Sequence, residues 1–313
     1  MNKNLKINGI GMAVPHKVYT NEDIQRITPN SKADWIEDKL GIKQRHVCTT
    51  ENVVELGFQA AQQALMMADM LEHEIELIIV NTSSSDKLSP SVSCMIQNKL
   101  NAKCPSFDIN AVCSGFIYAL DMAVPLLDKY KNILVVSTET YSKITDWKDT
   151  NSCFFGDGAA AVIISKSDIT NFFSEIGADG IGWEHFNCDR NSTFQMNGKE
   201  VYKFGTRVLP TQIQKLLTDN KLSLDDIDWV IPHQPSHNVL KETARILGIA
   251  EDKVYFNMER YGNTAGASVP MALYDGIKNG SIQNGDRLIL AAIGSGWTYG
   301  VAYLKLDLKK LKI

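Results

Sequence analysis

Several features that would direct a protein to a membrane or to nucleic acid are missing from this sequence. No run approaches the roughly 18 consecutive apolar residues of a membrane span. The first residues, MNKNLKINGIGM, are polar and lack the apolar core of a signal peptide. Basic residues are not in excess, because 32 Lys and Arg stand against 36 Asp and Glu, for a net charge of −4. We therefore expect a cytoplasmic protein whose main partner is neither a membrane nor nucleic acid.

Metal-binding and disulfide patterns are also missing. The six cysteines, at positions 48, 94, 104, 113, 153 and 188, form no CxxC pair and no regular framework. This favours reduced thiols, most of them small buried core residues. The six histidines show no convincing zinc-ligand spacing. We expect no metal site, so a cysteine with a chemical role must be recognised by its surroundings.

What is present is the composition of an ordinary globular protein, 44% hydrophobic and 22% charged. Short β-branched runs typical of buried strands alternate with helical patterns. This predicts an α/β fold with parallel strand pairing and helices on the sheet faces. The strand-like runs of the first half are 75–83, 106–113, 132–139 and 158–165, and the helical patterns are 53–70, 91–100 and 115–130.

The second half of the chain repeats this order at an offset near 150 residues. A repeat of this length indicates a duplicated domain rather than a solenoid. We place the division between residues 1–168 and 169–313, with 165–171 as the seam, and expect a loop or cap at 182–200. The repeated strand-like runs are 227–234, 253–263, 286–294 and 298–306, and the repeated helical patterns are 238–247 and 267–278.

Duplication places three chemically useful side chains together. Cys113 and Asn263 are expected to occupy the same place in the two copies, each at the end of a central strand where a helix begins. His233 ends the neighbouring strand of the second copy. Ligands of parallel α/β sheets bind beyond the carboxyl ends of the strands. The sequence therefore predicts that the three side chains converge on one face.

The surroundings of Cys113 suit a nucleophile. In NAVCSGF a strand ends, small residues follow and an apolar helix starts. The positive end of the helix dipole is therefore expected to lower the pKa of the thiol. Gly115 permits a tight turn and the close approach of a substrate. A lone cysteine is more often a buried structural residue, but this position and the two downstream partners favour the nucleophile.

Two further motifs supply hydrogen-bonding groups. His233 ends an apolar strand between Pro232 and Pro235, which fixes it in space. Asn263 lies in GNTAGASVP, where the ordinary interpretation is a turn. Its amide N–H stays neutral at every accessible pH and suits an oxyanion donor. The glycine run 294–300 matches no phosphate-binding pattern and predicts a tight turn whose backbone N–H groups face the same cleft.

These motifs carry a family resemblance. NAVCSGF, PHQ and GNTAGASVP, in this order and spacing, with FGDGAAA and GSGWTYG, resemble β-ketoacyl-[acyl-carrier-protein] synthase III and its relatives in the thiolase superfamily. The resemblance runs from about Gly9 to the C-terminus. It implies the thiolase fold, an α/β fold in which two duplicated halves form five layers, αβαβα.

The resemblance also implies a reaction, the decarboxylative Claisen condensation of an acyl-CoA with a malonyl thioester on acyl carrier protein. It makes Cys113 the residue that accepts the acyl group, and His233 and Asn263 the pair that stabilises the enolate. The backbone amides of Cys113 and Ser295 would form the oxyanion hole. Coenzyme A thioesters are then substrates, and neither a metal nor a redox cofactor is required.

Around these residues the chain departs from the family. Lys39 stands beside Trp35 where an arginine is usual, and this weakens the expected contact with the adenine of coenzyme A because lysine cannot stack and fork as arginine does. The resemblance assigns Gly198 and Lys203 to coenzyme A or carrier binding as well. These departures favour an enzyme that keeps the condensation reaction of the family but uses a different acyl donor or a different carrier.

The resemblance further implies a homodimer in which a loop of one subunit closes the acyl pocket of the other. That loop corresponds to residues 84–90, is polar and is one residue longer than expected, and places Leu88 toward the partner's site. Ile293 stands where an aromatic residue often bounds the acyl pocket. Leu88 and Ile293 are therefore the predicted acyl-pocket residues.

Other functions stay open. A synthase III-like enzyme of secondary metabolism, with a non-acetyl acyl donor or a small-molecule acceptor, fits the altered surroundings. A cysteine thioester hydrolase uses the same residue types, but such hydrolases are not built from a duplicated α/β half. A hydroxymethylglutaryl-CoA synthase-like reaction is disfavoured because it needs a glutamate near the position of Ser83, where the sequence has none. The presence of all three residues Cys113, His233 and Asn263 argues against a non-catalytic subunit of a larger synthase.

Overall fold

The first half of the chain forms a mixed sheet of five strands in the computed structural model, which describes residues 4–308. The order across the sheet is β1-β7-β6-β4-β5. The strands are β1 (Lys6–Ala13), β4 (Leu77–Asn81), β5 (Ser106–Ile109), β6 (Ile133–Glu139) and β7 (Gly158–Ser165). Three helices cover its two faces, namely α3 (Val53–Ala68) and α4 (Val92–Leu100) on one side and α5 (Gly115–Leu126) on the other.

The second half repeats this sheet in the order β8-β13-β12-β11. Where the first sheet has β5, the described part of the second half has a single parallel bridge between Val254 and Val230. The strands are β8 (Phe172–Ala178), β11 (Trp229–Pro232), β12 (Arg287–Gly294) and β13 (Thr298–Lys305). The helices are α6 (Gly198–Asp219) and α7 (His237–Leu247) on the outer face and α9 (Ser268–Lys278) on the inner face.

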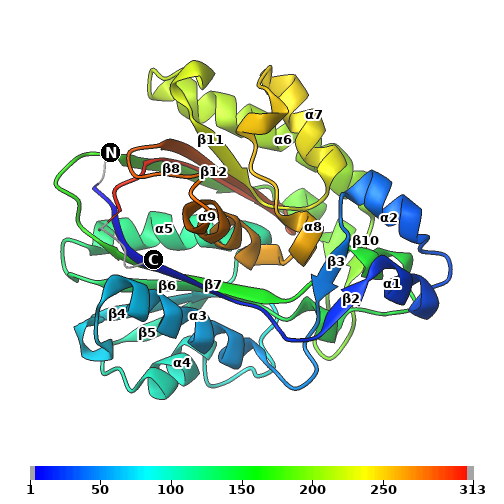
Figure 1. Cartoon of the computed structure of the whole chain (residues 1–313), viewed down its shortest axis with the longest axis horizontal. Helices are drawn as coiled ribbons and strands as arrows, with labels where there is room; N and C mark the ends of the chain where they lie inside the picture. The colour runs from blue at the N-terminus through cyan, green and yellow to red at the C-terminus, as the bar shows by residue number, and fades with distance from the viewer. Residues whose placement is uncertain (1–3, 309–313) are drawn as a thin grey trace.

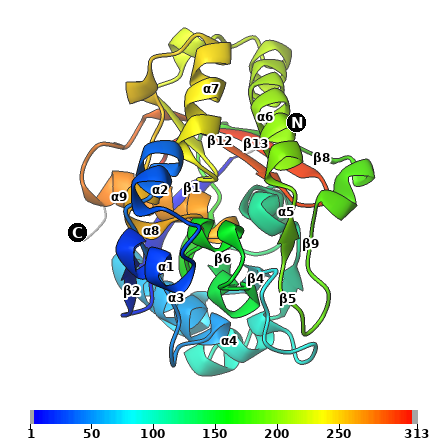
Figure 2. The ribbon, with the colours of Figure 1, turned by 90° about the vertical axis from the view of Figure 1, so that its right-hand side faces the viewer.

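The two halves stack into five layers. In Figure 1, α3 and α4 lie below the first sheet, α5 and α9 lie between the sheets, and α6 and α7 lie above the second sheet. Figure 2 shows the same central position of α5 and α9 from the side. The predicted αβαβα thiolase fold is confirmed. The division at residues 168 and 169 stays a prediction, which the short connection between β7 and β8 supports.

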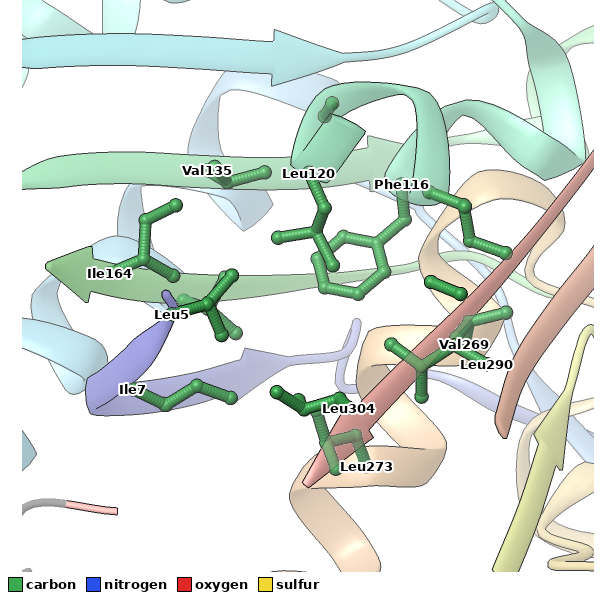
Figure 3. Packing of buried hydrophobic residues seen from close by; sticks show 14 of the residues in the cluster. Leu5, Ile7, Phe116, Leu120, Val135, Ile164, Val269, Leu273, Leu290 and Leu304 are labelled. Atoms are coloured by element: carbon green, nitrogen blue, oxygen red, sulfur yellow. The ribbon is translucent and has the colours of Figure 1, made fainter. Parts of the chain in front are cut away.

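The core of the molecule lies in the central helical layer. Side chains from both sheets and from α5 and α9 meet there, and burying each large apolar side chain contributes about 1.5–3 kcal/mol. Figure 3 shows how they interdigitate, with Phe116 and Leu120 of α5 facing Val269 of α9. The other labelled members are Leu5, Ile7, Val135, Ile164, Leu273, Leu290 and Leu304, all at most 2% exposed.

The prediction of parallel pairing is wrong for part of each sheet. β5, β4 and β6 are parallel, as are β11 and β12, but β7 runs antiparallel to both β6 and β1, and β13 runs antiparallel to both β12 and β8. The reason is the connection. A parallel pair needs a long crossover, whereas only residues 295–297 join β12 to β13, which permits a hairpin alone.

A long helix replaces the end of the predicted loop at 182–200. Residues up to 197 form the short turn η5 (Gly180–His185) and the paired strands β9 (Phe186–Asn187) and β10 (Gln195–Met196). The side chain of Asn197 then accepts from the backbone N–H of Glu200, and α6 begins at Gly198. The sequence analysis missed this helix because its first turns are polar and contain two glycines.

The N-terminal elements form a flap beside the second half. β2 (Val18–Thr20) pairs with β3 (Gln44–His46), and α1 (Asn21–Ile27) packs against α2 (Ala33–Leu40). In Figure 1, α2 lies next to α7, and the two helices are in contact. This arrangement brings the residues of α2 to the edge of the second sheet.

Candidate active site

Cys113 lies on a sharp turn between β5 and α5. The amide oxygen of Asn110 accepts a hydrogen bond from the backbone N–H of Val112 (3.2 Å). Val112 has a φ of 50°, in the left-handed region that a β-branched residue rarely adopts. The hydroxyl of Ser114 donates to the carbonyl of Ala111 (2.8 Å). Cys113 therefore stands next to the first turn of α5.

A matching turn precedes α9. The amide oxygen of Asn263 accepts from the backbone N–H of Ala265 (2.9 Å), and Ala265 has a φ of 45°. The hydroxyl oxygen of Ser268 lies 2.9 Å from the carbonyl oxygen of Ala265. Because the amide oxygen of Asn263 is engaged, its amide nitrogen is left as a donor for other partners. The backbone of Asn263 is itself anchored, since its N–H donates to the carbonyl of Phe154 (2.9 Å).

The register of the duplication differs from the predicted one. Asn110 and Asn263 are 153 residues apart and make the same amide bond, to Val112 and to Ala265 respectively. At this offset the counterpart of Cys113 is Gly266. The prediction that Cys113 and Asn263 occupy the same place is therefore wrong by three residues, although both belong to equivalent turns.

The two turns meet at Asn81, the last residue of β4. A Cβ atom at Gly115 would lie 1.7 Å from the amide oxygen of Asn81. A Cβ atom at Gly266 would lie 2.2 Å from its amide nitrogen and 2.8 Å from the carbonyl of Val112. Only glycine lets the turns approach so closely. Their contact brings the turn that carries Cys113 beside the turn that follows Asn263.

His233 follows β11 and is fixed at both its backbone and its ring. Its backbone N–H donates to the carbonyl of Ala291 (2.7 Å), and its Nδ1 lies 2.7 Å from the hydroxyl oxygen of Ser268. Burial lowers the pKa of His233 to about 3. The imidazole is therefore neutral at every pH near 7.

Cys113, His233 and Asn263 line one pocket of about 440 Å³, within the range of small-molecule sites. The predicted convergence of the three side chains is thus present. Most of the wall is apolar or aromatic, and Lys39 is the only charged lining residue among those described. The pocket suits a ligand whose enclosed part is largely uncharged. Its other lining residues include Trp35, Phe154, Phe155, Phe186, Met196, Gly198, Val201, Tyr202, Ile293, Ser295 and Trp297.

Within residues 4–308, no group of three or more His, Cys, Asp or Glu side chains could hold a metal ion. In the same range, none of the helices is both long and apolar enough to cross a membrane.

Comparison with known proteins identifies the family. Residues 107–180 match the sequence model described as 3-oxoacyl-[acyl-carrier-protein (ACP)] synthase III, and residues 217–306 match that of its C-terminal part. A protein of Clostridium acetobutylicum named beta-ketoacyl-[acyl-carrier-protein] synthase III is 38% identical over 96% of this chain and 98% of its own. The chain belongs to the synthase III family.

Solved structures of a synthase III enzyme and of a priming β-ketosynthase share the fold closely. The enzyme of Aquifex aeolicus is 36% identical and has a TM-score of 0.93, over 96% of this chain and 99% of its own. The priming β-ketosynthase from the R1128 polyketide biosynthetic pathway also has a TM-score of 0.93, at 26% identity, over 98% of this chain and 97% of its own. Similarity within the synthase III family therefore covers nearly the whole chain.

The structure brings together three of the four residues predicted to bind coenzyme A or the carrier. Trp35, Lys39 and Gly198 line the pocket of this synthase III chain. Lys203 does not. Its ammonium pairs with Glu200 at 2.7 Å and lines a separate hollow on the outer side of α6. The resemblance assigned Lys203 to the site, but neighbouring positions on a helix face different sides, and Lys203 lies on a side of α6 that does not line the pocket.

The predicted acyl-pocket residues are also separated. Ile293 lines the pocket, and Ser295 follows it on the same turn. Leu88 lies elsewhere, 74% exposed on a loop that borders a second hollow. Within one chain Leu88 does not reach Cys113, so its predicted role toward a partner subunit stays a prediction.

The predicted shift of the Cys113 pKa has the wrong direction. Burial raises the pKa of the thiol, and the nearby carboxylate of Glu139 raises it further, while hydrogen bonding from the backbone lowers it by less. The helix terminus that motivated the prediction is present. However, Cys113 is only 4% exposed, and loss of water disfavours the charged thiolate that the prediction expected.

Glu139 is the buried group that sequence analysis missed. Its carboxylate accepts hydrogen bonds from the backbone N–H of Ser83 (3.1 Å) and from the hydroxyl of Ser84 (2.6 Å). Burial raises the pKa of Glu139 to about 7. The available signal was an ionisable residue at the carboxyl end of an apolar strand, β6, in the same sheet as the strand that leads to Cys113.

Glu139 also corrects the statement that no glutamate lies near Ser83. The two residues are distant in sequence but bonded in the fold. This ground for disfavouring a hydroxymethylglutaryl-CoA synthase-like reaction therefore falls. The structure still disfavours this reaction for another reason. Glu139 is fully buried and does not line the pocket, so its carboxyl group cannot reach a substrate directly.

Proposed function

We propose that this chain is an acyltransferase that condenses an acyl-CoA with malonyl-[acyl-carrier-protein] to give a 3-oxoacyl-[acyl-carrier-protein], carbon dioxide and free coenzyme A. Membership of the synthase III family supports the reaction. The single observation that carries the assignment to residues is that Cys113, His233 and Asn263 line the same pocket. The substrates are thioesters, and the reaction uses no cofactor.

In the first step the sulfur of Cys113 attacks the carbonyl carbon of the acyl thioester. A new carbon–sulfur bond forms, the bond to coenzyme A breaks, and the proton of Cys113 leaves with the coenzyme A thiol. The backbone N–H groups of Cys113 and Ser295 stabilise the developing oxyanion. Support comes from the closeness of the two segments, since a Cβ on Gly294 would lie 3.1 Å from the backbone nitrogen of Cys113.

His233 does not hold the Cys113 proton as a free base. The ordinary pKa of a thiol is about 9, and burial raises that of Cys113, whereas the pKa of His233 is about 3. Burial disfavours both the thiolate and the imidazolium that this proton transfer would form. His233 therefore works as a neutral hydrogen-bonding group.

In the second step the malonyl thioester loses carbon dioxide, and the electron pair of the broken carbon–carbon bond forms an enolate. The amide nitrogen of Asn263 and Nε2 of His233 donate hydrogen bonds to the enolate oxygen. The enolate carbon then attacks the acyl group on Cys113. The sulfur of Cys113 leaves and takes up a proton, which restores the thiol.

Ser268 positions His233 for this step. For Nε2 of His233 to donate, Nδ1 must accept, and the hydroxyl of Ser268 is the group at Nδ1. The single proton of that hydroxyl can go to His233 or to the carbonyl of Ala265 (2.9 Å). Ser268 is thus a positioning residue that sets the tautomer of the ring.

Coenzyme A and the carrier arm enter along α2 and α6. Trp35, half-exposed at the mouth, offers an aromatic face, and Lys39 offers one positive charge. We place the enzyme in the cytoplasm as a homodimer, with an acyl carrier protein as its macromolecular substrate. The edge strand β5 supports the homodimer, since its outer edge has no strand partner within residues 4–308.

A priming condensation in a specialised pathway is the second candidate. It differs in the acyl donor or acceptor, not in the chemistry. Two observations favour it, the single charged residue lining the pocket and the fold shared with a priming β-ketosynthase of a polyketide pathway.

The test separates the two half-reactions. Intact-protein mass spectrometry after incubation with acyl-CoA measures acylation, and product formation from malonyl-[acyl-carrier-protein] measures condensation. Cys113→Ala should abolish both. Asn263→Ala should keep acylation and slow condensation by about 100- to 1000-fold. Normal product formation by Cys113→Ala would refute the nucleophile, and release of free acid without condensation would favour the hydrolase.

A further inference from the structure

A buried carboxyl group lies close to the turn that carries Cys113. Glu139 ends β6 and is fully buried. A Cβ atom at Gly266 would lie 3.1 Å from a carboxylate oxygen of Glu139 and 2.8 Å from the carbonyl oxygen of Val112. Val112 directly precedes Cys113 in the chain. The carboxyl group and the turn with the nucleophile therefore border the same point of the contact between the two halves.

The hydrogen-bond partners of Glu139 are all uncharged. Its carboxylate accepts from the hydroxyl of Ser83 (3.1 Å), from the backbone N–H of Ser83 (3.1 Å) and from the hydroxyl of Ser84 (2.6 Å). Among residues 4–308, no lysine, arginine or histidine forms an ion pair with it. A buried charge without an opposite charge beside it is costly, so the fold favours the protonated carboxyl group.

The ionisable groups around Glu139 supply no free positive charge. Cys113 lies on the neighbouring turn, and Tyr141 shares a hydrogen-bonded serine with Glu139. Burial raises the pKa of the Tyr141 phenol well above its ordinary value, so this group stays neutral. On the outer side, the ammonium of Lys143 is paired with the carboxylate of Asp86 at 3.1 Å. A negative charge on Glu139 would therefore act on Cys113 without a cation to offset it.

Each charge that develops on the reacting atoms is negative. In the proposed reaction the sulfur of Cys113 passes through a thiolate, the attacked carbonyl becomes an oxyanion, and the malonyl thioester becomes an enolate. His233 is neutral, and Lys39 is the only charged residue that lines the described pocket. A further negative charge at Glu139 would oppose all three, because little water is present to screen it.

We propose that Glu139 is a positioning residue whose neutral form allows Cys113 to become a thiolate and whose ionisation suppresses the nucleophile. Glu139 acts through Cys113 and touches no substrate. Its part in catalysis rests on the proposed function, whereas its effect on the thiol can be measured without an acyl donor. We expect ionised Glu139 to lower the thiolate fraction of Cys113 about tenfold.

Alkylation by iodoacetamide measures this thiolate. The thiolate sulfur displaces iodide and forms a carbon–sulfur bond, and the thiol proton goes to solvent. Peptide mass spectrometry follows Cys113 and the exposed Cys94 in one sample between pH 6 and pH 9. Glu139→Gln, which is neutral at every pH, should react at Cys113 as fast as the wild type at pH 6 and about tenfold faster at pH 9. Cys94 should react equally in both proteins.

The wild-type profile tests the inference without any substitution. The alkylation rate of an isolated thiol rises about tenfold per pH unit below its pKa. Between pH 7 and pH 8 the rate at Cys113 should instead rise only about threefold, because Glu139 loses its proton over this range. A full tenfold rise would overturn the inference even if Glu139→Gln did not fold.

Asp157→Asn is the matched control. Asp157 is a second buried carboxyl group, bonded to the backbone N–H groups of Cys48 (2.7 Å) and Ser142 (2.8 Å). Its replacement should leave the ratio of the Cys113 rates at pH 9 and pH 6 at the wild-type value.

The outcomes are distinguishable. Equal profiles for Glu139→Gln and the wild type, or slower reaction of the variant at pH 9, would overturn the inference. A difference of the same size at pH 6 and at pH 9 would also overturn it, because it would indicate a structural effect rather than a charge. Acylation by acyl-CoA should show the same pH-dependent gain in Glu139→Gln. If alkylation follows the expected pattern but no acyl-CoA acylates Cys113, the proposed function fails and the effect of Glu139 on the thiol stands.

Discussion

Two buried groups, Glu139 and His233, have pKa values shifted toward their neutral forms, and their effects on the stability of the fold oppose each other. Burial raises the pKa of Glu139 from 4.5 to about 7 and lowers that of His233 from 6.5 to about 3. The folded protein thus holds a proton on Glu139 that the unfolded chain releases. It also lacks a proton on His233 that the unfolded chain binds. Glu139 contributes fully to the free energy of unfolding below pH 4.5, and this contribution is lost as the pH rises toward 7. His233 contributes fully above pH 6.5, and its contribution is lost as the pH falls from 6.5 to 3.

Glu139→Gln isolates the first of these effects. The variant is neutral at every pH, so its free energy of unfolding, relative to the wild type, should rise between pH 4.5 and 7 by up to about 3 kcal/mol, the value of the pKa shift. Urea unfolding at pH 5 and pH 8 measures the difference. The exposed Glu184→Gln is the control and should give no such trend. If the free energies of unfolding of Glu139→Gln and the wild type differed by the same amount at pH 5 and at pH 8, the prediction would be contradicted.

Ser268 provides a second prediction at this scale. In Ser268→Ala, Nδ1 of His233 loses the hydroxyl that can donate to it, so the ring can keep its proton on Nδ1 and withdraw the donor from the enolate. Condensation should slow by about tenfold or more, with acylation of Cys113 little changed. Ser268→Thr, which keeps a hydroxyl, should restore part of the rate. Equal slowing of both half-reactions would point to a structural role instead.

At the scale of elements, the site is made by two equivalent turns in contact. Each places a residue in the left-handed region, Val112 in one and Ala265 in the other, and each is closed by an asparagine amide. Backbone strain of this kind costs of order 1–3 kcal/mol per residue and persists only where surrounding contacts hold it. Here the contact is between the turns themselves, through Asn81.

Gly266→Ala tests that contact. The added methyl group would lie 2.2 Å from Asn81 and 2.8 Å from the carbonyl of Val112, so one turn has to move. We expect a loss of stability of about 2–3 kcal/mol and a loss of Cys113 acylation, because the displaced turn carries the nucleophile. Gly180→Ala, where an added Cβ meets nothing within 4 Å, is the matched control for urea unfolding. Wild-type acylation by Gly266→Ala would show that the turns are not coupled.

Sequence patterns predicted the elements of the site better than its register. The ends of apolar strands placed Cys113 and His233 correctly, because a strand ending in small or polar residues is a local signal. The same patterns aligned Asn263 with Cys113, whereas the structure aligns it with Asn110, three residues earlier. The hydrogen bond that shows this equivalence is visible only in three dimensions.

Long-range effects were out of reach of the sequence. The direction of the Cys113 pKa shift depends on burial by side chains from several elements. The bond between Glu139 and Ser83 joins residues 56 positions apart. The antiparallel pairing of β12 with β13 followed from the short connection of residues 295–297, which the sequence did contain but which the alternation of strands and helices obscured.

For the whole molecule, the prediction concerns assembly. The proposed homodimer would have twice the chain mass of 34.8 kDa. Leu88 is 74% exposed on a loop bordering a hollow. Leu88→Lys should weaken the dimer by about tenfold or more, as expected for an apolar anchor at an interface. Light scattering after size exclusion measures the mass over a dilution series.

Met66→Lys is the control for this experiment. Met66 is similarly exposed, at 71%, but lies on α3, and its replacement should leave the dimer intact. A monomeric wild-type protein at micromolar concentration would remove the homodimer from the proposal, and equal effects of the two substitutions would remove the role of Leu88.

The glycine at position 266 has a consequence for how the duplicated halves divide their work. The turn that holds the nucleophile in one half holds no reactive side chain at the matching place in the other, and this vacancy is what allows the two turns to touch. Under the proposed mechanism each half is chemically incomplete, since the first half would carry the acyl group on Cys113 and the second half would stabilise the carbanion that attacks it. Neither half could carry out the proposed reaction alone, so the reaction would depend on the contact between the two turns rather than on either half.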